Sequence, residues 1–230
     1  MTTPPGVREL HLDRVARQCE GMSNRLVFFG LEACGDLLSP APRSYPAVAA
    51  EALVLATISA ERAAGELGRA GFIRERRDGD NELWRSPDGL RLRLYPSDEA
   101  SPESEAGMAR EYGVLLTRQR MTSSGLRIRA AAAPVAFLLW WLDHRAGKRP
   151  AWDSVRAEDL VELVARHDAF AAELATMPDE VSLAVRRACA TFAAEADSRT
   201  VIEQALLEAR TTAGFTAMVL RRFADLGRAA

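Results

Sequence analysis

Hydrophobic and polar positions change their spacing near the middle of the chain. Up to about residue 130, short apolar runs alternate with helical patterns and with turn-forming residues. From Pro134 onward, apolar positions recur almost throughout at the spacing of amphipathic helices. The pattern predicts an α/β domain at 1–131 and a helical domain at 132–230. The expected fold is therefore α/β (α+β), with a mixed sheet flanked by helices and a helical bundle after it.

The first half predicts a strand-rich sheet with few helices. The expected helices are 7–22, 31–38 and 60–70, and the expected strands are 25–29, 51–58, 72–77, 82–85, 90–95 and 126–130. Ser59 is the expected N-cap of the third helix, and Gly71 its end. The segment 108–121 fits a helix or a strand, and the prolines of 40–46 predict a connecting loop.

The second half predicts helices at 134–146, 154–174, 179–196 and 200–227. Thr200 and Glu203 have the spacing of a capping box, which indicates a helix start there. Trp140 and Trp141 are adjacent and point about 100° apart on a helix, so only one of them is expected to face the core. Phe215, Val219 and Phe223 recur every four residues, so the last helix docks on the bundle or on a second copy of the chain. A homodimer through these C-terminal helices is one expectation.

Composition excludes several classes of protein. The chain has 230 residues and a formal net charge of -2, with 30 basic against 32 acidic side chains, so no global field attracts nucleic acid or an anionic membrane. Any such contact must be local. Cys19, Cys34 and Cys189 lie far apart, which predicts reduced thiols without a zinc site or disulfides. The chain shows no signal peptide and no apolar stretch of roughly 20 residues, so we expect a cytoplasmic protein without a membrane partner.

Several local motifs resemble one protein family in the same order. The run Phe28-Phe29-Gly30-Leu31 looks like the family's strand that ends in Gly-Gly or Gly-Ser. The loop Arg43-Ser-Tyr-Pro-Ala47-Val-Ala49 looks like its Arg-x-Thr-x-Asp-x-Asp, and 89–96 looks like its Gly-x-x-Val-Asp-Val-x-Pro strand. The segments 134–142 and 156–160 resemble its Pro-x-x-Phe-Leu-x-x-Lys-Leu and Asp-x-x-Asp-Leu helices. The chain thus resembles the bacterial nucleotidyltransferase toxins of the abortive-infection AbiEii type, within the polymerase-beta-like superfamily.

The resemblance keeps scaffold residues and loses the polar functional ones. The family's metal-binding aspartates fall on Ala47, Ala49 and Arg93, and its helical lysine falls on Trp141. Alanine cannot bind Mg²⁺, and an arginine repels it. The resemblance therefore implies a nucleotidyltransferase fold without metal-dependent catalysis, a pseudoenzyme that binds a protein partner, an RNA or a nucleotide. Its candidate ligand-binding residues are Gly30, Arg43, Arg91, Arg93 and Trp141.

Two other functions stay open. An active toxin of a toxin–antitoxin pair would use Mg²⁺ and an NTP to modify tRNA or protein, with relocated carboxylates at Glu32, Asp36 and Glu51. The ordinary alternative for Glu32 and Asp36 is a solvated helix face. The other hypothesis is a structural or homodimeric scaffold that binds no ligand.

The remaining charged side chains form two basic clusters. Arg74 and Arg76, like Arg91 and Arg93, recur at a spacing of two, so one sheet face is expected to present them together as a phosphate contact or as a solvated surface. The second cluster is Arg118, Arg120, Arg127 and Arg129. No Walker-type or Gly-x-Ser-x-Gly loop is present, and the three histidines are expected at the surface or at an interface.

Overall fold

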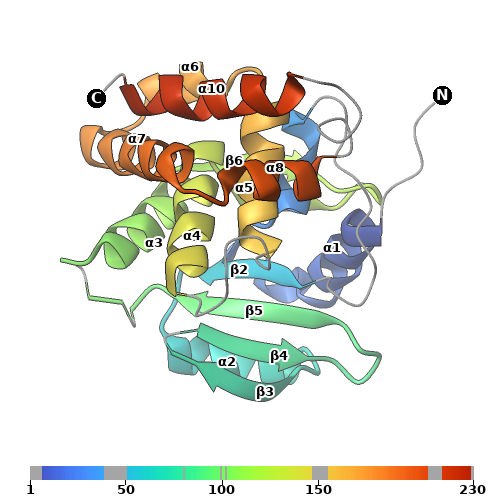
Figure 1. The fold of residues 1–230 in the computed structure, drawn as a ribbon. Helices are drawn as coiled ribbons and strands as arrows, with labels where there is room; N and C mark the ends of the chain where they lie inside the picture. Colours follow the sequence, from blue (N-terminus) through green and yellow to red (C-terminus); the bar gives the residue numbers. More distant parts are fainter. Residues whose placement is uncertain are drawn as a thin grey trace. The chain divides into compact units, whose positions relative to one another are not determined.

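The chain folds into two compact units. The computed structural model describes residues 7–38, 51–79, 81–98, 100–101, 103–146, 155–206 and 214–228. Unit 1 comprises Met1–Asp36 and Arg43–Ala132, and unit 2 comprises Leu37–Pro42 and Ala133–Ala230. Unit 1 holds a seven-stranded mixed sheet, whereas the described part of unit 2 is helical (Figure 1). The fold class is therefore mixed α/β with an open sheet, as the hydrophobic pattern predicts.

The sheet has the strand order β3-β4-β5-β2-β1-β7-β6. The strands are β1 Leu26–Phe28, β2 Ala52–Ala56, β3 Ile73–Asp78, β4 Asn81–Arg85, β5 Arg91–Pro96, β6 Thr117–Met121 and β7 Arg127–Ala131. β2 pairs with β5, and β1 with β7, in parallel, and all other neighbours are antiparallel. The predicted three-stranded meander is thus β3-β4-β5, joined to the rest of the sheet through the parallel pair β5 and β2.

Two helices of unit 1 cover one face of this sheet. The α-helices of unit 1 are α1 Val7–Gln18, α2 Ala60–Arg69 and α3 Glu105–Leu115. Two segments are 3₁₀ helices, η1 Glu20–Met22 and η2 Leu31–Leu37. The apolar stripes of α1 and α2 pack on Phe28, Val54, Trp84, Leu92 and Leu94, which share one face because they are aligned across the strands. Burying this cluster supplies the main stabilisation of unit 1.

Local signals set the ends of α2 as the sequence predicts. The Ser59 hydroxyl accepts a hydrogen bond from the backbone N–H of Arg62 (3.4 Å), which caps the helix. Gly71 follows the helix with φ +87°, a conformation that favours glycine. The ambiguous segment 108–121 divides into the end of α3 and all of β6, because the backbone beyond Leu116 pairs with β7 instead of continuing the helix.

Unit 2 is a bundle of helices. They are α4 Ala133–Ala146, α5 Val155–Arg166, α6 Phe170–Ala175, α7 Asp179–Ala194, α8 Ser198–Ala205 and α10 Phe215–Arg228. α10 lies along α7 and also contacts α5 and α8 (Figure 1). The ring of Phe223 lies 4.4 Å from that of Phe192, centroid to centroid, and Val219 is also fully buried. The apolar stripe of α10 therefore docks on its own bundle.

Three expectations for the helical half are wrong. The predicted helix 154–174 is interrupted between α5 and α6, where His167 and Phe170 form local turn bonds. α8 begins at Ser198, so Thr200 lies inside it and does not cap it. Trp140 and Trp141 are both buried, because α4 is surrounded on nearly all sides. Residues 207–213 of the predicted helix 200–227 lie outside the described residues. In the described part of the chain, no helix combines the length and apolarity that a bilayer crossing requires.

Candidate functional site

The candidate site lies on the sheet face opposite α1 and α2. Leu53 of β2 is directly opposite Arg93 of β5, and Arg93 is in turn opposite Leu83 of β4. Glu51 precedes β2 by one residue. Because side chains alternate between the two faces of a strand, Glu51, Leu53 and Arg93 point to the same side. The sheet thus brings together two of the residues that the sequence selected, Glu51 and Arg93.

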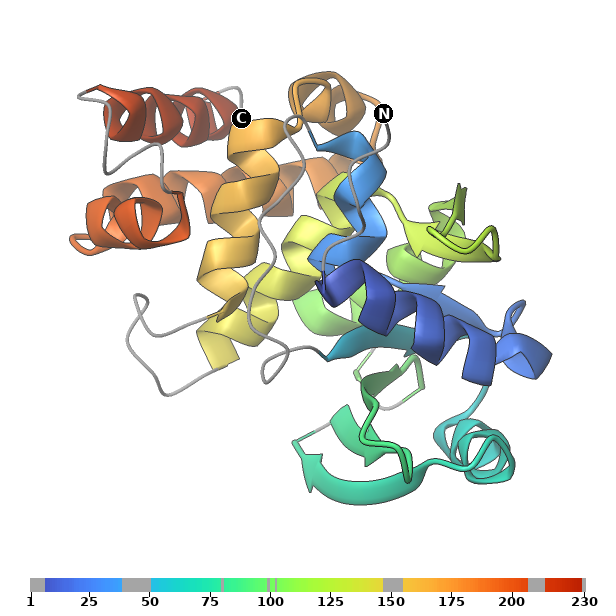
Figure 2. The same cartoon turned by 90° about the vertical axis from the view of Figure 1, so that its right-hand side faces the viewer.

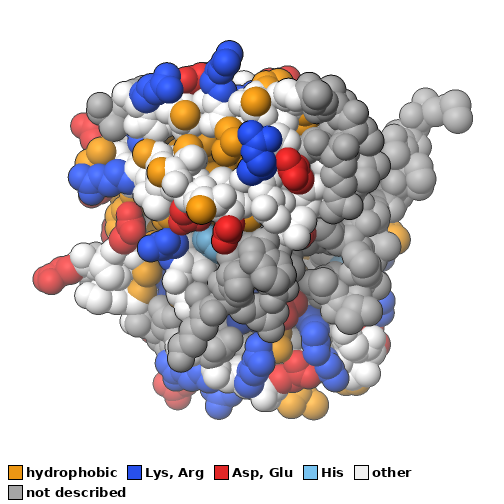
Figure 3. All heavy atoms as spheres, in the orientation of Figure 1, with side chains coloured by type: hydrophobic (Ala, Val, Ile, Leu, Met, Phe, Trp, Pro, Cys, Tyr) orange, Lys and Arg blue, Asp and Glu red, His pale blue; other side chains and the backbone are white. Residues whose placement is uncertain are grey.

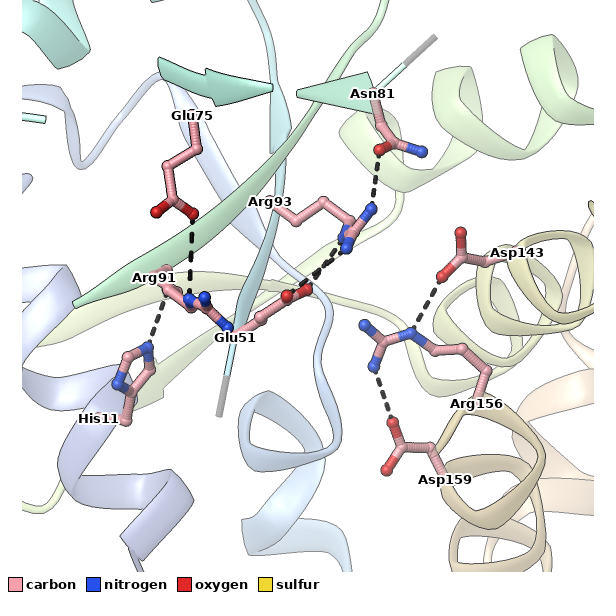
Figure 4. Close-up of polar contacts among 9 residues, drawn as sticks. All are labelled: His11, Glu51, Glu75, Asn81, Arg91, Arg93, Asp143, Arg156 and Asp159. Atoms are coloured by element: carbon pink, nitrogen blue, oxygen red, sulfur yellow. Dashed lines mark hydrogen bonds and ion pairs between the residues drawn. The ribbon is translucent and has the colours of Figure 1, made fainter. Parts of the chain in front are cut away.

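Arg93 is bound to side chains on both neighbouring strands. Its Nε and Nη2 donate to the two carboxylate oxygens of Glu51 at 2.9 and 3.5 Å, and its Nη1 donates to Asn81 Oδ1 at 3.0 Å (Figure 4). The side chains of Arg93 and Glu51 are 12% and 18% exposed. An ion pair between two largely buried groups with near-parallel hydrogen bonds is strongly oriented. The Glu51 carboxylate is therefore neutralised from within the chain.

Arg91 lies beside this pair in a second row of charges. Arg91 is opposite Arg85 on β4, and Glu75 of β3 accepts from Arg85 at 2.7 Å and lies 3.9 Å from Arg91. The imidazole Nε2–H of His11 donates to the backbone carbonyl of Arg91 at 2.8 Å (Figure 4). Burial lowers the pKa of His11, which keeps the ring neutral near pH 7. The backbone of Arg91 is thus held by α1, whereas its side chain lies 3.9 Å from the nearest carboxylate oxygen of β3.

Arg74 and Arg76 do not lie on one face of the sheet as predicted, because a β-bulge separates them. Arg74 pairs with Trp84, but Arg76 pairs with Leu83, so the bulge between them turns Arg74 and Arg76 to opposite faces. Arg76 joins the candidate face, whereas Arg74 donates to buried Glu82 at 2.8 Å on the core side. The candidate face then includes four arginines and two glutamates: Arg76, Arg85, Arg91, Arg93, Glu51 and Glu75. Basic side chains with acidic ones among them are visible around β3 and β4 in Figure 3.

The residues of this face do not fit a magnesium ion. Mg²⁺ prefers carboxylate and other oxygen ligands, but Leu53 and Arg93 flank Glu51 at the adjoining positions. Among the described residues there is no group of three or more His, Cys, Asp and Glu side chains that could hold a metal. A guanidinium within hydrogen-bond distance of Glu51 already supplies the positive charge that a metal would supply. We therefore derive no metal-dependent step at this face.

The two carboxylates of η2 are engaged elsewhere. The Glu32 carboxylate lies directly against Gly30, where an added Cβ would collide with it. Arg118 donates to both oxygens of Asp36 at 2.6 and 2.8 Å, and Arg120 lies 3.3 Å from Asp36. Burial alone would raise the pKa of Asp36, but the hydrogen bonds and charges of these arginines outweigh it and lower that pKa. Glu32 and Asp36 thus do not join Glu51 in a described metal-binding group.

The second basic cluster has a structural role for three of its four arginines. Arg118 also donates to the carbonyl of Ala33 at 2.7 Å, and Arg120 donates to the carbonyl of Glu32. Arg129 donates to the carbonyls of Asn24 and Val114, both at 3.0 Å. These bonds attach η2, α3 and the turn before β1 to strands β6 and β7. Arg127 is exposed on β7.

Unit 2 places its own candidates in the interior of the bundle. Trp141 is buried, its ring lies 5.7 Å from that of His144, and the Arg145 guanidinium lies 5.6 Å above it. Arg156, at a position where the resemblance expects an aspartate, donates to Asp159 at 3.1 Å and to Asp143 at 3.0 Å (Figure 4). Asp159 is fully buried. Asp159 therefore takes part in an internal ion-pair group.

Two of the three histidines, which the sequence places at the surface or at an interface, are buried inside the helical unit. His144 and His167 are buried, and His167 Nε2 lies 3.0 Å from Glu173 Oε1. Burial lowers the pKa of His144, so its ring is neutral near pH 7. Cys19, Cys34 and Cys189 are buried free thiols, and burial raises the pKa of each to about 12. None of these three thiols is a nucleophile at neutral pH.

The sequence missed two partners of the candidate face. Asn81 accepts from Arg93, and Glu75 binds Arg85 and Arg91, but neither has a distinctive local motif. The cross-strand register alone brings them to the site. Arg43, Ala47 and Ala49 lie outside the described residues, so their expected roles stay predictions.

No protein-family model matches this chain, and no curated protein sequence matches it. The likeness to nucleotidyltransferases is therefore an expectation carried by the sequence motifs quoted above.

Proposed function

We propose that this chain is a nucleotidyltransferase-like protein without metal-dependent catalysis, which acts by binding a nucleotide or an RNA phosphate group. The observation that carries the proposal is the Arg93–Glu51 pair. At the strand position where the resemblance expects a carboxylate, Arg93 holds the nearest carboxylate at 2.9 Å. An arginine supplies a permanent positive charge and two parallel donors, which suit phosphate oxygens without a metal.

The charge of the candidate face supports a phosphate-bearing ligand. Its four arginines outnumber its two glutamates, although the whole chain is slightly acidic. Glu75 lies 2.7 Å from Arg85 but 3.9 Å from Arg91, so Arg91 is held only weakly by a carboxylate. An incoming phosphate oxygen competes easily with an ion pair of that length. Arg91 is therefore the first residue of this face that we expect to contact the ligand.

The same replacement occurs at a second motif, within unit 2. There Arg156 occupies an acidic position of the resembling family, and it too is bound to local carboxylates. Removing one partner of such a buried pair is costly, so Arg156 and Asp159 stabilise this part of the bundle only as a pair. Two acidic motif positions that became paired arginines favour a binding protein over an enzyme with a displaced metal site.

The proposal is tested by measuring transfer and binding on the same protein. Each of the four labelled NTPs is incubated with the protein, total tRNA and Mg²⁺, and binding is measured separately by equilibrium dialysis in EDTA. We expect no label on tRNA or on the protein, and a binding constant that EDTA leaves unchanged. Arg91→Ala weakens the binding severalfold, because an exposed charge pair is worth up to about 1 kcal/mol. Arg127→Ala, an exposed arginine on β7, is the matched control and leaves the binding unchanged.

Two outcomes contradict the proposal. Mg²⁺-dependent transfer that disappears in Glu51→Ala would identify an active transferase with relocated carboxylates. If folded protein binds neither NTP nor tRNA, the binding function is wrong and a scaffold without a ligand becomes the better account.

A further inference from the structure

A hollow lies in unit 1, on the side of the sheet that α1 and α2 cover. The C-terminal end of α1, η1 and the C-terminal end of α2 surround it, and its volume is about 440 Å³. Figure 2 shows these elements on the same side of the unit. Its lining residues are Gln18, Cys19, Gly21, Met22, Arg25, Glu66, Arg69 and Ala70. The volume lies within the usual range of small-molecule sites, about 300–1,000 Å³.

Three arginines surround a single carboxylate at this hollow. Glu66 is nearly buried, with 8% of its side chain exposed, and Arg25 forms a short ion pair with its Oε1. Arg62 and Arg69 lie 3.6 and 3.8 Å from the same oxygen, from the preceding and following turns of α2. Within the described residues, no other carboxylate lies within ion-pair distance of these three guanidinium groups. The cluster therefore has a surplus of two positive charges.

The donors of two of these arginines are available to a ligand. Arg62 and Arg69 are 61% and 76% exposed, and their distances to Glu66 exceed hydrogen-bond length. No side-chain hydrogen bond of either arginine occurs in the part of the chain that the structure describes. An arginine with a purely structural role donates hydrogen bonds to other groups of the chain, as Arg118 does to Asp36 and Ala33. In this cluster Arg25 alone is close enough to Glu66 for a hydrogen bond.

The surroundings of the cluster do not offset its positive charge. The last carbonyls of α2 are hydrogen-bonded: Leu67 accepts from Phe72 N–H, Gly68 from Gly71 N–H, and Ala70 from the Gln18 amide at 2.8 Å. The negative end of the helix is thereby largely satisfied. Cys19 is protonated, because burial raises the pKa of its thiol to about 12. The hollow thus presents two cationic groups beside a neutral floor.

We propose that this hollow binds phosphate groups through Arg62 and Arg69, with Arg25 and Glu66 as their fixed support. The ligand is either a free oligophosphate, such as the phosphate chain of a nucleotide, or the backbone of a single-stranded RNA. The site lies across the sheet from Arg91 and Arg93, and it does not depend on the proposed function. Guanidinium groups recognise phosphate by paired N–H donors, which is the chemistry available here.

Methionine methyl NMR tests this site directly. Met22 lines the hollow, whereas Met121 lies on β6 and Met218 lies on α10. Inorganic pyrophosphate is titrated into ¹³C-methyl-methionine protein, and a short oligouridylate is titrated in a parallel experiment. We expect the Met22 signal to shift saturably and the signals of Met121 and Met218 to stay in place.

Variants assign the shift to the arginines. Arg62→Ala/Arg69→Ala leaves the Arg25–Glu66 pair intact and removes the surplus charge, so the affinity falls about tenfold. Arg199→Ala, an exposed arginine of α8, is the matched control and leaves the titration unchanged. Arg91→Ala also leaves it unchanged, which separates this site from the candidate face. If the RNA backbone is the ligand, the oligouridylate binds more tightly than pyrophosphate, and the double variant lowers the magnitude of its salt slope by about 1.4, since each phosphate contact on a single strand contributes about 0.7.

Two results would overturn the inference. One is the absence of any Met22 shift with both probes. The other is wild-type affinity in the folded double variant.

Discussion

The ion pair between Arg93 and Glu51 makes a quantitative prediction about the stability of unit 1. Arg93→Met keeps much of the aliphatic volume but removes two bonds to Glu51 and one to Asn81. Removing one partner of a buried ion pair typically costs about 3–5 kcal/mol. Since Arg93 is 12% and Glu51 is 18% exposed, water recovers part of this energy. We expect a loss of about 2–3 kcal/mol in the free energy of unfolding.

Most of that cost comes from the carboxylate left without a cation. In Arg93→Met/Glu51→Met the uncompensated charge is gone, so the double variant is expected to be more stable than the sum of the two single variants predicts. The coupling energy from this cycle should be about 1–2 kcal/mol. Urea denaturation gives the free energies, and hydrogen exchange of the β2 and β5 amides reports unit 1 separately from unit 2.

The matched control is Arg127→Met on β7. Arg127 is exposed, so its substitution should change the stability by less than about 0.5 kcal/mol. An Arg93→Met variant that is as stable as this control would refute the reasoning. So would strictly additive effects of the Arg93 and Glu51 substitutions, because the two side chains would then not interact.

Three further predictions concern packing and pH. Phe223→Ala removes a fully buried ring that contacts Phe192 and should cost about 3–5 kcal/mol, measured by urea denaturation; a loss below 1 kcal/mol would contradict the packing of α10. The pKa of Asp36 is lowered in the folded state, so its ion pairs stabilise the protein above pH 3.8, the ordinary pKa, and this stabilisation is lost as the pH falls further. Asp36→Asn should therefore make the free energy of unfolding less sensitive to acid between pH 5 and pH 2. A variant with the same acid sensitivity as the wild type would refute this role of Asp36. Burial lowers the pKa of His144, so the folded state loses stability as the pH falls below 6.5, the ordinary pKa of histidine. His144→Gln should reduce the change in melting temperature between pH 7 and pH 5. If the variant loses as many degrees as the wild type over this range, His144 is not the cause.

Much of the fold could be predicted from the sequence because local signals are strong there. Alternating and apolar runs locate the strands of unit 1, since a half-buried strand needs one apolar face. Ser59 and Gly71 fix the ends of α2 because capping and positive φ depend on the residue itself. Helical spacing likewise locates the helical segments of unit 2, but it joins α5 to α6 and α8 to α10 in single predicted helices.

Other features of the candidate site and fold were decided only by tertiary contacts. The bulge between Arg74 and Arg76 depends on pairing with β4, so the spacing of two in the sequence could not show that the side chains diverge. Leu116 ends a helix and begins a strand because β7 offers backbone partners there. Asn81 reaches Arg93 only through cross-strand register.

The sequence by itself determined the fold class and most of the secondary structure, and it has Arg93 and Trp141 where the resemblance expects an aspartate and a lysine. The structure decided how the charged side chains pair: Arg93 neutralises Glu51 across two strands, and Arg62 and Arg69 lie around a carboxylate that Arg25 already neutralises. The physical reason is that hydrophobic periodicity is encoded locally, whereas the pairing of charges depends on distances between segments that only the folded chain brings together.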